Sequence, residues 1–275
     1  MATAAMATRF EFLVPQPPDA GRARAACEEA IQEILRVEDR LSLFRQGSVV
    51  AELNREAVHR PMPVDGEVFA WLSLCDELHR VTAGAFDAAL GGTMKALGFR
   101  GSIPTSIGSA GWAHVELDVR SHRVRIHDAR VQLDLGGIGK GIALDLAGRI
   151  LKDAGLSSYL LHGGTSTVLA SGLGRNGKPF RVGIQHPSAG HLLCNAALHN
   201  EALSVSGQHT QKLGEQGHVL NPSDPQAPSS HILSAVTHPS AAHADAYSTA
   251  LLAGPFPMQP PLRCLLLLPQ PHQIF

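Results

Sequence analysis

A glycine-rich stretch in the middle of the chain, DLGGIGKGIALD over residues 134–145, constrains fold and chemistry more than any other segment. It holds four glycines within six positions, and glycine lets a backbone turn tightly and approach a ligand closely. Ile142, Leu146 and Ile150 then recur at helical spacing, so the turn is expected to open an amphipathic helix. The positive end of such a helix suits a phosphate or pyrophosphate. A plain tight turn packed against its helix is the alternative.

Two common phosphate motifs do not fit this stretch. Lys140 is followed by Gly141 where a P-loop has Ser or Thr, and no glycine stands five residues before Gly139. The dinucleotide-binding fingerprint fails as well. If the turn binds a phosphate, it does so as part of another kind of site.

Composition excludes several classes of function. The chain has 275 residues, 44% of them hydrophobic, which suffices for one large domain or two lobes. A formal net charge of −1 and the absence of a block of like charge argue against nucleic-acid and membrane-surface binding. The apolar run at 264–268 is too short to span a bilayer, and the N-terminus shows no export signal, so we expect a cytoplasmic protein without a membrane anchor.

The cysteines Cys27, Cys75, Cys194 and Cys264 are widely spaced and form no CxxC pair. Neither a zinc ribbon nor a disulfide framework is indicated, and we expect buried, reduced thiols.

Hydrophobic periodicity predicts long helices between short strands. Because the strands follow one another in meanders, the pattern indicates an α+β fold and not a doubly wound sheet. Helices are predicted at 22–41, 68–81 and 242–252, and strands at 10–14, 115–117, 123–126, 131–135, 159–161, 167–170, 181–184, 196–198, 202–205, 232–236 and 265–268.

Four segments carry groups suited to phosphoryl chemistry: AFD at 85–87, the glycine turn, the SVSG and HVLNP segments within 204–222, and HADAYSTALL at 243–252. Together with AMATRFE at 5–11, SLFRQGS at 42–48 and LN at 53–54, their order resembles the ApbE family, the FAD:protein FMN transferases. The resemblance implies one ApbE-like domain over 1–275, with mixed or antiparallel sheets, flanking helices and FAD in a central cleft. Two interlocked lobes are the alternative division.

Members of that family bind FAD with Mg²⁺, cleave its pyrophosphate and attach FMN through a phosphoester to a Ser or Thr of an acceptor protein, with AMP leaving. The resemblance therefore implies FAD as substrate, Mg²⁺ as metal and an acceptor protein as partner. The choice between Mg²⁺ and Mn²⁺, the identity of the acceptor and the oligomeric state stay open.

Asp245 and Thr249 are four residues apart, so on a helix their oxygens share one side, where a hard cation could bind. By resemblance, these two side chains and the backbone carbonyl of Gly137 hold the metal. Spacing alone equally fits Asp245 as a helix N-cap with Thr249 merely exposed.

By resemblance, His218 is the catalytic base that takes the proton from the acceptor hydroxyl, a task that suits the near-neutral pKa of histidine. Phe44 would stack on the isoalloxazine, and Lys140 would meet a phosphate or a carboxylate. Without the family, Phe44 and Phe86 fit core residues, and Asp145 fits a helix-surface or salt-bridging group. The FAD contacts that the resemblance assigns are Met6, Phe44, Ala85, Phe86, Asp87, Asp134, Lys140 and His218.

Three positions depart from the family pattern on the acceptor side. Asn221 stands where H-x-x-D-P has its acid, residues 165–167 read TST where relatives continue with an acid or amide and an arginine, and His209 replaces an aromatic. FMN transfer is therefore weighed against two alternatives, FAD hydrolysis to FMN and AMP, and FAD binding without turnover.

Overall fold

A seven-stranded antiparallel sheet forms the centre of the fold, in the computed structural model that describes residues 1–99, 110–187, 190–208, 212–213, 216–217, 219–225, 231–257 and 263–267. Each pair of neighbouring strands is antiparallel, although only β1–β2, β6–β7 and β13–β14 are consecutive among the assigned strands. The strands, in spatial order, are β1 (Ala2–Ala5), β2 (Thr8–Leu13), β6 (Tyr159–Gly163), β7 (Thr167–Ser171), β10 (Glu201–Gly207), β13 (Leu233–His238) and β14 (Arg263–Leu267).

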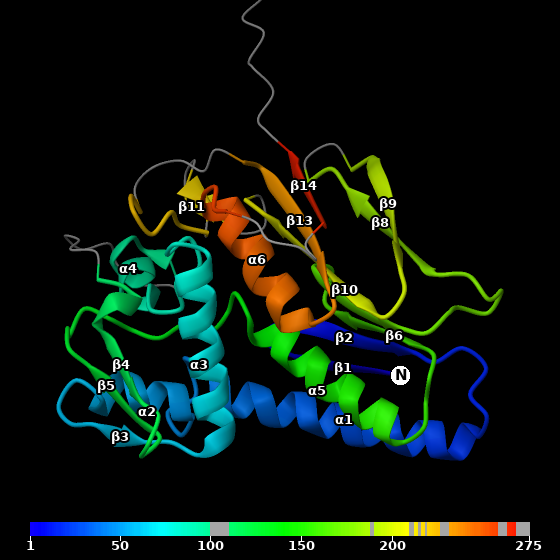
Figure 1. Ribbon diagram of the computed structural model, residues 1–275, viewed down its shortest axis with the longest axis horizontal. Coiled ribbons are helices and arrows are strands. Elements are labelled where there is room, and N and C mark those ends of the chain that lie inside the picture. Colours follow the sequence, from blue (N-terminus) through cyan, green and yellow to red (C-terminus); the bar gives the residue numbers. More distant parts are fainter. Residues whose placement is uncertain are drawn as a thin grey trace, which may run out of the picture.

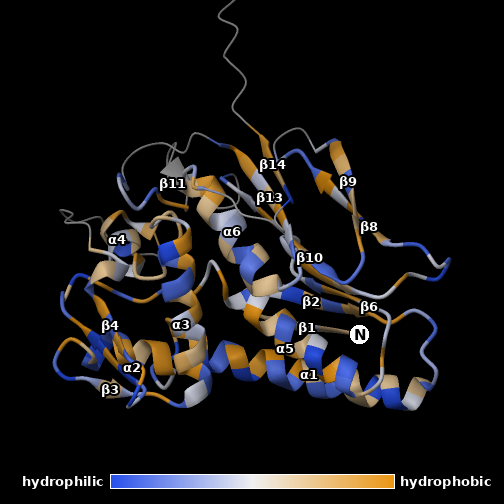
Figure 2. Cartoon of the chain, in the orientation of Figure 1, coloured by the Kyte–Doolittle hydropathy of each residue, from blue (hydrophilic) through white to orange (hydrophobic). Residues whose placement is uncertain are grey.

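Helices cover one face of this sheet (Figure 1). Helices α5 (Gly139–Asp153) and α6 (Ala241–Ala253) pack on the sheet and on each other, and α1 (Ala20–Leu41) packs against α5 from outside. The amphipathic pattern of α1 explains this position, because its buried residues recur at helical spacing while hydrophilic segments alternate with them along the ribbon (Figure 2).

A β-hairpin, β8 (Phe180–Gln185) and β9 (Leu192–Leu198), packs on the other face. It buries Phe180, Ile184 and Leu198 against sheet residues such as Leu160 and Leu203. Both faces of the central strands are thereby buried, which is why β6 shows no clean alternation of apolar and polar residues.

A smaller antiparallel sheet, in the order β3 (Met62–Pro63), β5 (Arg123–Ile126) and β4 (Val115–Asp118), lies to one side of the central sheet (Figure 1). Three helices belong to this part of the chain: α2 (Val49–Glu56), α3 (Gly66–Val81) and α4 (Gly91–Ala96). A short 3₁₀ helix (Trp112–His114) and the strand pair β11 (Lys212–Leu213) and β12 (Gln216–Gly217) complete the assigned elements. Among the helices described, none is long and apolar enough to cross a bilayer.

The α+β prediction is confirmed, and the predicted helices and most predicted strands lie within a few residues of their observed bounds. The strand predicted at 131–135 is wrong. Val131, Leu133 and Leu135 do alternate as buried residues, but the segment forms a single isolated bridge, between Gln132 and Leu90, and its centre pairs with a side chain. Asn54 accepts a hydrogen bond from the Leu133 N–H at 2.6 Å and donates one to the Leu133 carbonyl at 3.0 Å.

The prediction of buried thiols is half correct. Cys27 and Cys75 are buried, but Cys194 and Cys264 are exposed on β9 and β14. Neither strand is covered along its whole length, so residues on their outer sides stay in contact with solvent.

Helices α5 and α6 cap each other's N-termini. Asp145 of α5 accepts hydrogen bonds from the backbone N–H groups of Ala241 at 2.7 Å and Ala242 at 3.0 Å. In return, Asp245 of α6 accepts one from the Gly141 N–H of α5 at 3.2 Å. Each carboxylate thus satisfies unpaired donors at the positive end of the other helix. The expectation that Asp145 is a surface or salt-bridging group is wrong.

This double cap requires a glycine at position 141. A Cβ there would lie 2.3 Å from the carbonyl oxygen of Ala241. We expect Gly141→Ala to destabilise the protein by about 1–3 kcal/mol, since the overpacking outweighs the higher helix propensity of alanine. Urea unfolding followed by circular dichroism measures this change. Gly47→Ala is the control, because a Cβ at Gly47 meets nothing within 4 Å, and equal stability of the two variants would contradict the interlock.

Candidate functional site

The carboxylate of Asp245 lies at the centre of the candidate site. Asp245 is only 2% exposed. The Nζ atom of Lys140 lies 3.3 Å from its Oδ1 and 3.2 Å from its Oδ2. The Thr167 and Ser204 hydroxyls each donate to Oδ1 at 3.1 Å. Because Ser240 is the N-cap of α6 and Asp245 lies in a later turn, the alternative that Asp245 caps its own helix is wrong.

The other two predicted metal ligands lie next to each other. The Thr249 hydroxyl is 3.5 Å from the Gly137 carbonyl oxygen and donates to the Asp245 backbone carbonyl at 3.0 Å. A Cβ on Gly137 would approach the Thr249 side chain to 3.2 Å, so only glycine lets the turn come this close without displacement. Thr249 is half-buried, which contradicts the alternative that it is merely exposed.

These residues fit a small, hard cation by their chemistry. A carboxylate, a hydroxyl and a backbone carbonyl are oxygen donors of the kind that Mg²⁺ takes in proteins. The described residues contain no group of three or more His, Cys, Asp or Glu that could hold a metal. The predicted set is of another type, since only one of its three ligands is an acidic side chain.

The glycine turn opens α5, as predicted, and the Gly136 N–H donates to Asp134 at 2.9 Å within it. The anion at the N-terminus of this helix is a side chain of the protein itself, the Asp245 carboxylate, which contacts both the Gly141 N–H and Lys140. Of the two partners expected for Lys140, a phosphate or a carboxylate, the structure shows the carboxylate. The turn is therefore more than a packing element, because it neutralises a buried charge.

Asn54 is a contributor to the site that the sequence did not reveal. Its side chain holds Leu133, one residue before Asp134, through two hydrogen bonds. Within the same segment, the Asp134 N–H donates to the Ala88 carbonyl at 2.8 Å. The LN pair was part of the family resemblance, but nothing in the sequence near Asn54 indicates its partner 79 positions away.

The AFD segment lies beside the glycine turn. Phe86 is buried in the core, and its ring lies 3.5 Å from where a Gly137 Cβ would be. Asp87 accepts hydrogen bonds from the backbone N–H groups of Ala89 at 2.7 Å and Trp112 at 3.0 Å. Burial raises the pKa of Asp87 above its usual value, against the opposing effect of these two N–H groups. The Asp87 carboxylate thus fixes the local backbone, and Ala85 beside it is half-buried.

Met6 and Phe44 belong to two loops that Glu38 connects. The Met6 N–H donates to Glu38 at 2.6 Å, and the Arg45 guanidinium lies 3.4 Å from the other carboxylate oxygen. Met6 and Ala7 form the β1–β2 turn with positive φ angles of 51° and 56°, a costly conformation for residues other than glycine. Phe44 is 72% exposed, so the alternative that it is a core residue is wrong.

Two acceptor-side residues, His218 and His209, lie outside the described residues. Asn221 is half-buried, and its side-chain oxygen accepts a hydrogen bond from the Ser223 N–H at 3.0 Å. The amide that replaces the family's acid is therefore engaged in its own turn.

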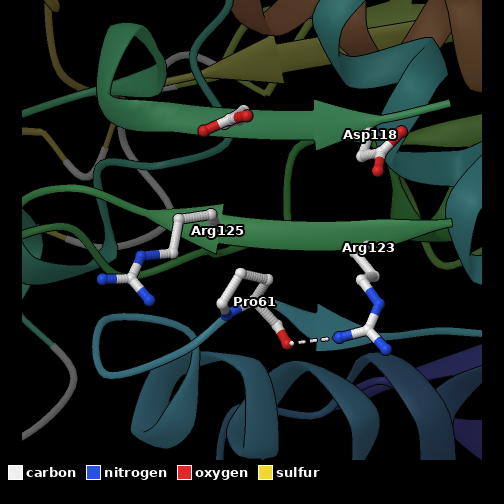
Figure 3. Close-up of a pocket in the computed structure, with 5 residues that line it drawn as sticks. Pro61, Asp118, Arg123 and Arg125 are labelled. Atoms are coloured by element: carbon white, nitrogen blue, oxygen red, sulfur yellow. Dashed lines mark hydrogen bonds between the residues drawn. The ribbon is translucent and has the colours of Figure 1, made fainter. Parts of the chain in front are cut away.

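Two surface hollows lie away from these residues. One, of about 160 Å³, is on the small sheet and is lined by Pro61, Asp118, Arg123 and Arg125 together with Glu116 (Figure 3). Arg123 donates to the Pro61 carbonyl there at 3.4 Å. The other, an open groove of about 840 Å³, follows the outer side of α5 past Arg149 and Lys152. Neither contains Asp245, Thr249 or Gly137 in its lining.

The sequence and the fold have counterparts among known proteins. The model of the ApbE family matches residues 6–257. The FAD:protein FMN transferase of Chlamydia trachomatis is 30% identical over 249 residues, covering 82% of this chain and 76% of that protein. That of Klebsiella pneumoniae is 28% identical over 82% of this chain and 71% of its own length. The crystal structure of the ApbE protein from Thermotoga maritima superposes with a TM-score of 0.81 at 23% identity, covering 91% of this chain and 84% of that one.

The chain thus has the fold of the flavin transferases to which it is similar, and it belongs to the ApbE family. The resemblance inferred from GAFD, DLGGIGKG and DAYSTALL is confirmed at the level of family and fold.

The Lys140–Asp245 pair gives a test of this geometry without substrate. We expect a double-mutant cycle with Lys140→Met and Asp245→Asn, in chelator-treated protein, to show a coupling energy of about 1–2 kcal/mol, because each single change removes the opposite charge from a partner in a largely buried place. Urea unfolding of the four proteins measures it. Strictly additive losses would show that the ion pair does not form in solution.

Proposed function

We propose that this protein transfers FMN from FAD to a Ser or Thr hydroxyl of an acceptor protein, with Mg²⁺ as the metal. The observation that carries the proposal is the meeting of Gly137, Asp245 and Thr249 around one turn of α5, in a chain of the ApbE family. These residues come from segments 112 positions apart, and their chemistry suits a metal-bound pyrophosphate.

Asp245, Thr249 and the Gly137 carbonyl would hold the Mg²⁺, which when bound neutralises charge on the FAD pyrophosphate. Lys140 and the positive end of α5 add to the same electrostatic field, since both already face the Asp245 carboxylate. With the cation bound to Asp245, the site would carry a net positive charge, which would stabilise the negative charge that develops on the leaving AMP phosphate.

On the acceptor side, His218 takes the proton from the acceptor hydroxyl. The hydroxyl oxygen forms a bond to the FMN phosphorus, and the bond from that phosphorus to the bridging oxygen breaks as AMP leaves. FAD would bind in a central cleft. The residues that would hold it are Met6, Phe44, Ala85, Phe86, Asp87, Asp134, Lys140 and His218. Of these, Phe44 offers an exposed ring for stacking, and Asp87 acts through the backbone that it fixes.

The direct test incubates the protein with FAD, Mg²⁺ and a candidate acceptor, then looks for flavin fluorescence on the acceptor band in a denaturing gel. We expect Asp245→Asn to lower the transfer rate at least ~100-fold, about 2.7 kcal/mol of transition-state stabilisation. A chelator should abolish transfer by the unchanged protein. Arg125→Gln, in the hollow on the small sheet, is the control and should retain full activity.

Two other outcomes correspond to other functions. Release of AMP without an acceptor, lost in Asp245→Asn, would indicate FAD hydrolysis. Binding of FAD without any AMP would indicate a flavin-binding protein without turnover, an alternative suggested by Asn221 and the 165–167 segment, because with Asn221 no carboxylate supports the base. Either result, together with no labelled acceptor, would overturn the proposed transfer.

Phe44 allows a separate test of flavin binding. We expect Phe44→Ala to weaken FAD binding about tenfold, since stacking on an aromatic ring contributes roughly 1–3 kcal/mol per base. The loss of this 72% exposed ring should leave the unfolding free energy nearly unchanged. Flavin fluorescence quenching measures the Kd. Val119→Ala, which alters an equally exposed residue in the turn between β4 and β5, is the control, and equal affinity of the two variants would exclude stacking by Phe44.

A further inference from the structure

We infer that Thr167 and Ser204 are positioning residues that fix the Asp245 carboxylate for metal binding. This inference rests on the proposed function, because it assigns a role to side chains that would not themselves contact the metal or FAD. Thr167 lies on β7 and Ser204 on the adjacent strand β10, at positions paired in register. Both residues are fully buried, with 0% exposure.

The two hydroxyls converge on one oxygen. Thr167 Oγ1 and Ser204 Oγ each lie 3.1 Å from Asp245 Oδ1, and they lie 3.2 Å from each other. The other carboxylate oxygen, Oδ2, accepts from the Gly141 N–H at 3.2 Å. The carboxylate is thus held from two strands of the sheet on one side and from α5 on the other, which leaves its plane little freedom to rotate.

The charge of Asp245 decides which groups donate in the hydrogen bonds of Thr167 and Ser204. An ionised carboxylate can only accept hydrogen bonds, so Thr167 and Ser204 must both point their protons at Asp245. Ser204 can then accept from the Ser248 hydroxyl at 3.1 Å, whose one proton also has the Asp245 backbone carbonyl within reach at 3.0 Å. The directions of the Thr167 and Ser204 hydroxyls are therefore fixed by the charge of the carboxylate.

Lys140 differs from these donors. The Thr167 and Ser204 side chains are short, and the Gly141 N–H belongs to the backbone. The Lys140 side chain, in contrast, is long and 21% exposed. A cation that binds Asp245 therefore displaces the lysine more easily than the hydroxyls. The hydroxyl pair keeps the carboxylate in place while its counter-ion changes, which is the task of residues that orient a metal ligand.

This role also accounts for one departure from the family pattern. The segment 165–167, TST, lacks the acid or amide and the arginine found in many relatives, and its last residue supplies one of the two hydroxyls. In this chain the altered segment therefore serves the metal side of the site.

The test compares Ser204→Ala with Ser234→Ala. Both residues are serines with 0% exposure that face α6. Ser234 differs because its hydroxyl donates to the Ser248 backbone carbonyl at 2.5 Å, whereas that of Ser204 donates to the Asp245 carboxylate. The probe is Mn²⁺, titrated in the presence of saturating FAD and without acceptor, with free Mn²⁺ counted by its electron paramagnetic resonance signal. We expect Ser204→Ala to weaken Mn²⁺ binding tenfold or more, and Ser234→Ala to leave it within twofold.

Thr167 provides a second pair. Thr167→Val keeps the shape of the side chain but removes the hydroxyl, whereas Thr167→Ser keeps the hydroxyl. We expect the valine variant to weaken Mn²⁺ binding about tenfold and the serine variant to retain it, even if both lose stability.

The outcomes separate this inference from the proposed function. If Ser204→Ala and Thr167→Val bind Mn²⁺ as tightly as the unchanged protein does, the positioning role alone is overturned. Absence of Mn²⁺ binding by the unchanged, FAD-loaded protein overturns the metal site and the positioning role together. If Ser204→Ala and Ser234→Ala weaken Mn²⁺ binding equally, the effect comes from a general loss of packing, and the positioning role is also overturned.

Discussion

The buried carboxylate of Asp245 is the interaction on which the site depends. A charge with 2% exposure is tolerated only where donors replace water, and here four groups do so: Lys140, the Gly141 N–H, Thr167 and Ser204. They come from α5 and from two strands of the central sheet. One carboxylate thereby fixes the relative position of α5, α6 and the sheet, and the candidate metal ligands lie where those elements meet.

The glycines of the turn have a structural reason in this context. Gly141 allows α5 and α6 to approach until Asp145 and Asp245 cap each other's helices, and Gly137 allows the turn to reach Thr249. A single segment therefore serves packing and chemistry at once. The interpretation of the glycine turn as a packing element is correct, and the positive end of α5 contacts the Asp245 carboxylate, while the predicted phosphate site stays a prediction.

The sequence predicted most of the fold because its periodic segments are long and their burial is one-sided, as in α1. It failed where pairing is not local. Residues 131–135 alternate like a strand, yet they form one isolated bridge to Leu90, and Leu133 at their centre pairs with the Asn54 side chain. No local pattern indicates a side chain 79 positions away. Phe44 was open to interpretation as a core residue, because hydrophobicity alone does not tell a buried ring from one held outward at 72% exposure. The prediction that Cys194 and Cys264 are buried was wrong for the same reason.

By itself, the sequence determined most of the helices and strands and the family, and it proposed the residues of the candidate metal site, because these follow from periodicity and from motifs within short segments. Only the tertiary structure decided which groups surround Asp245. Lys140, Thr167 and Ser204 lie 105, 78 and 41 positions from it, and their meeting depends on strand register and helix packing. Hydrogen bonding to a buried charge is a property of three-dimensional distance, which sequence spacing does not encode.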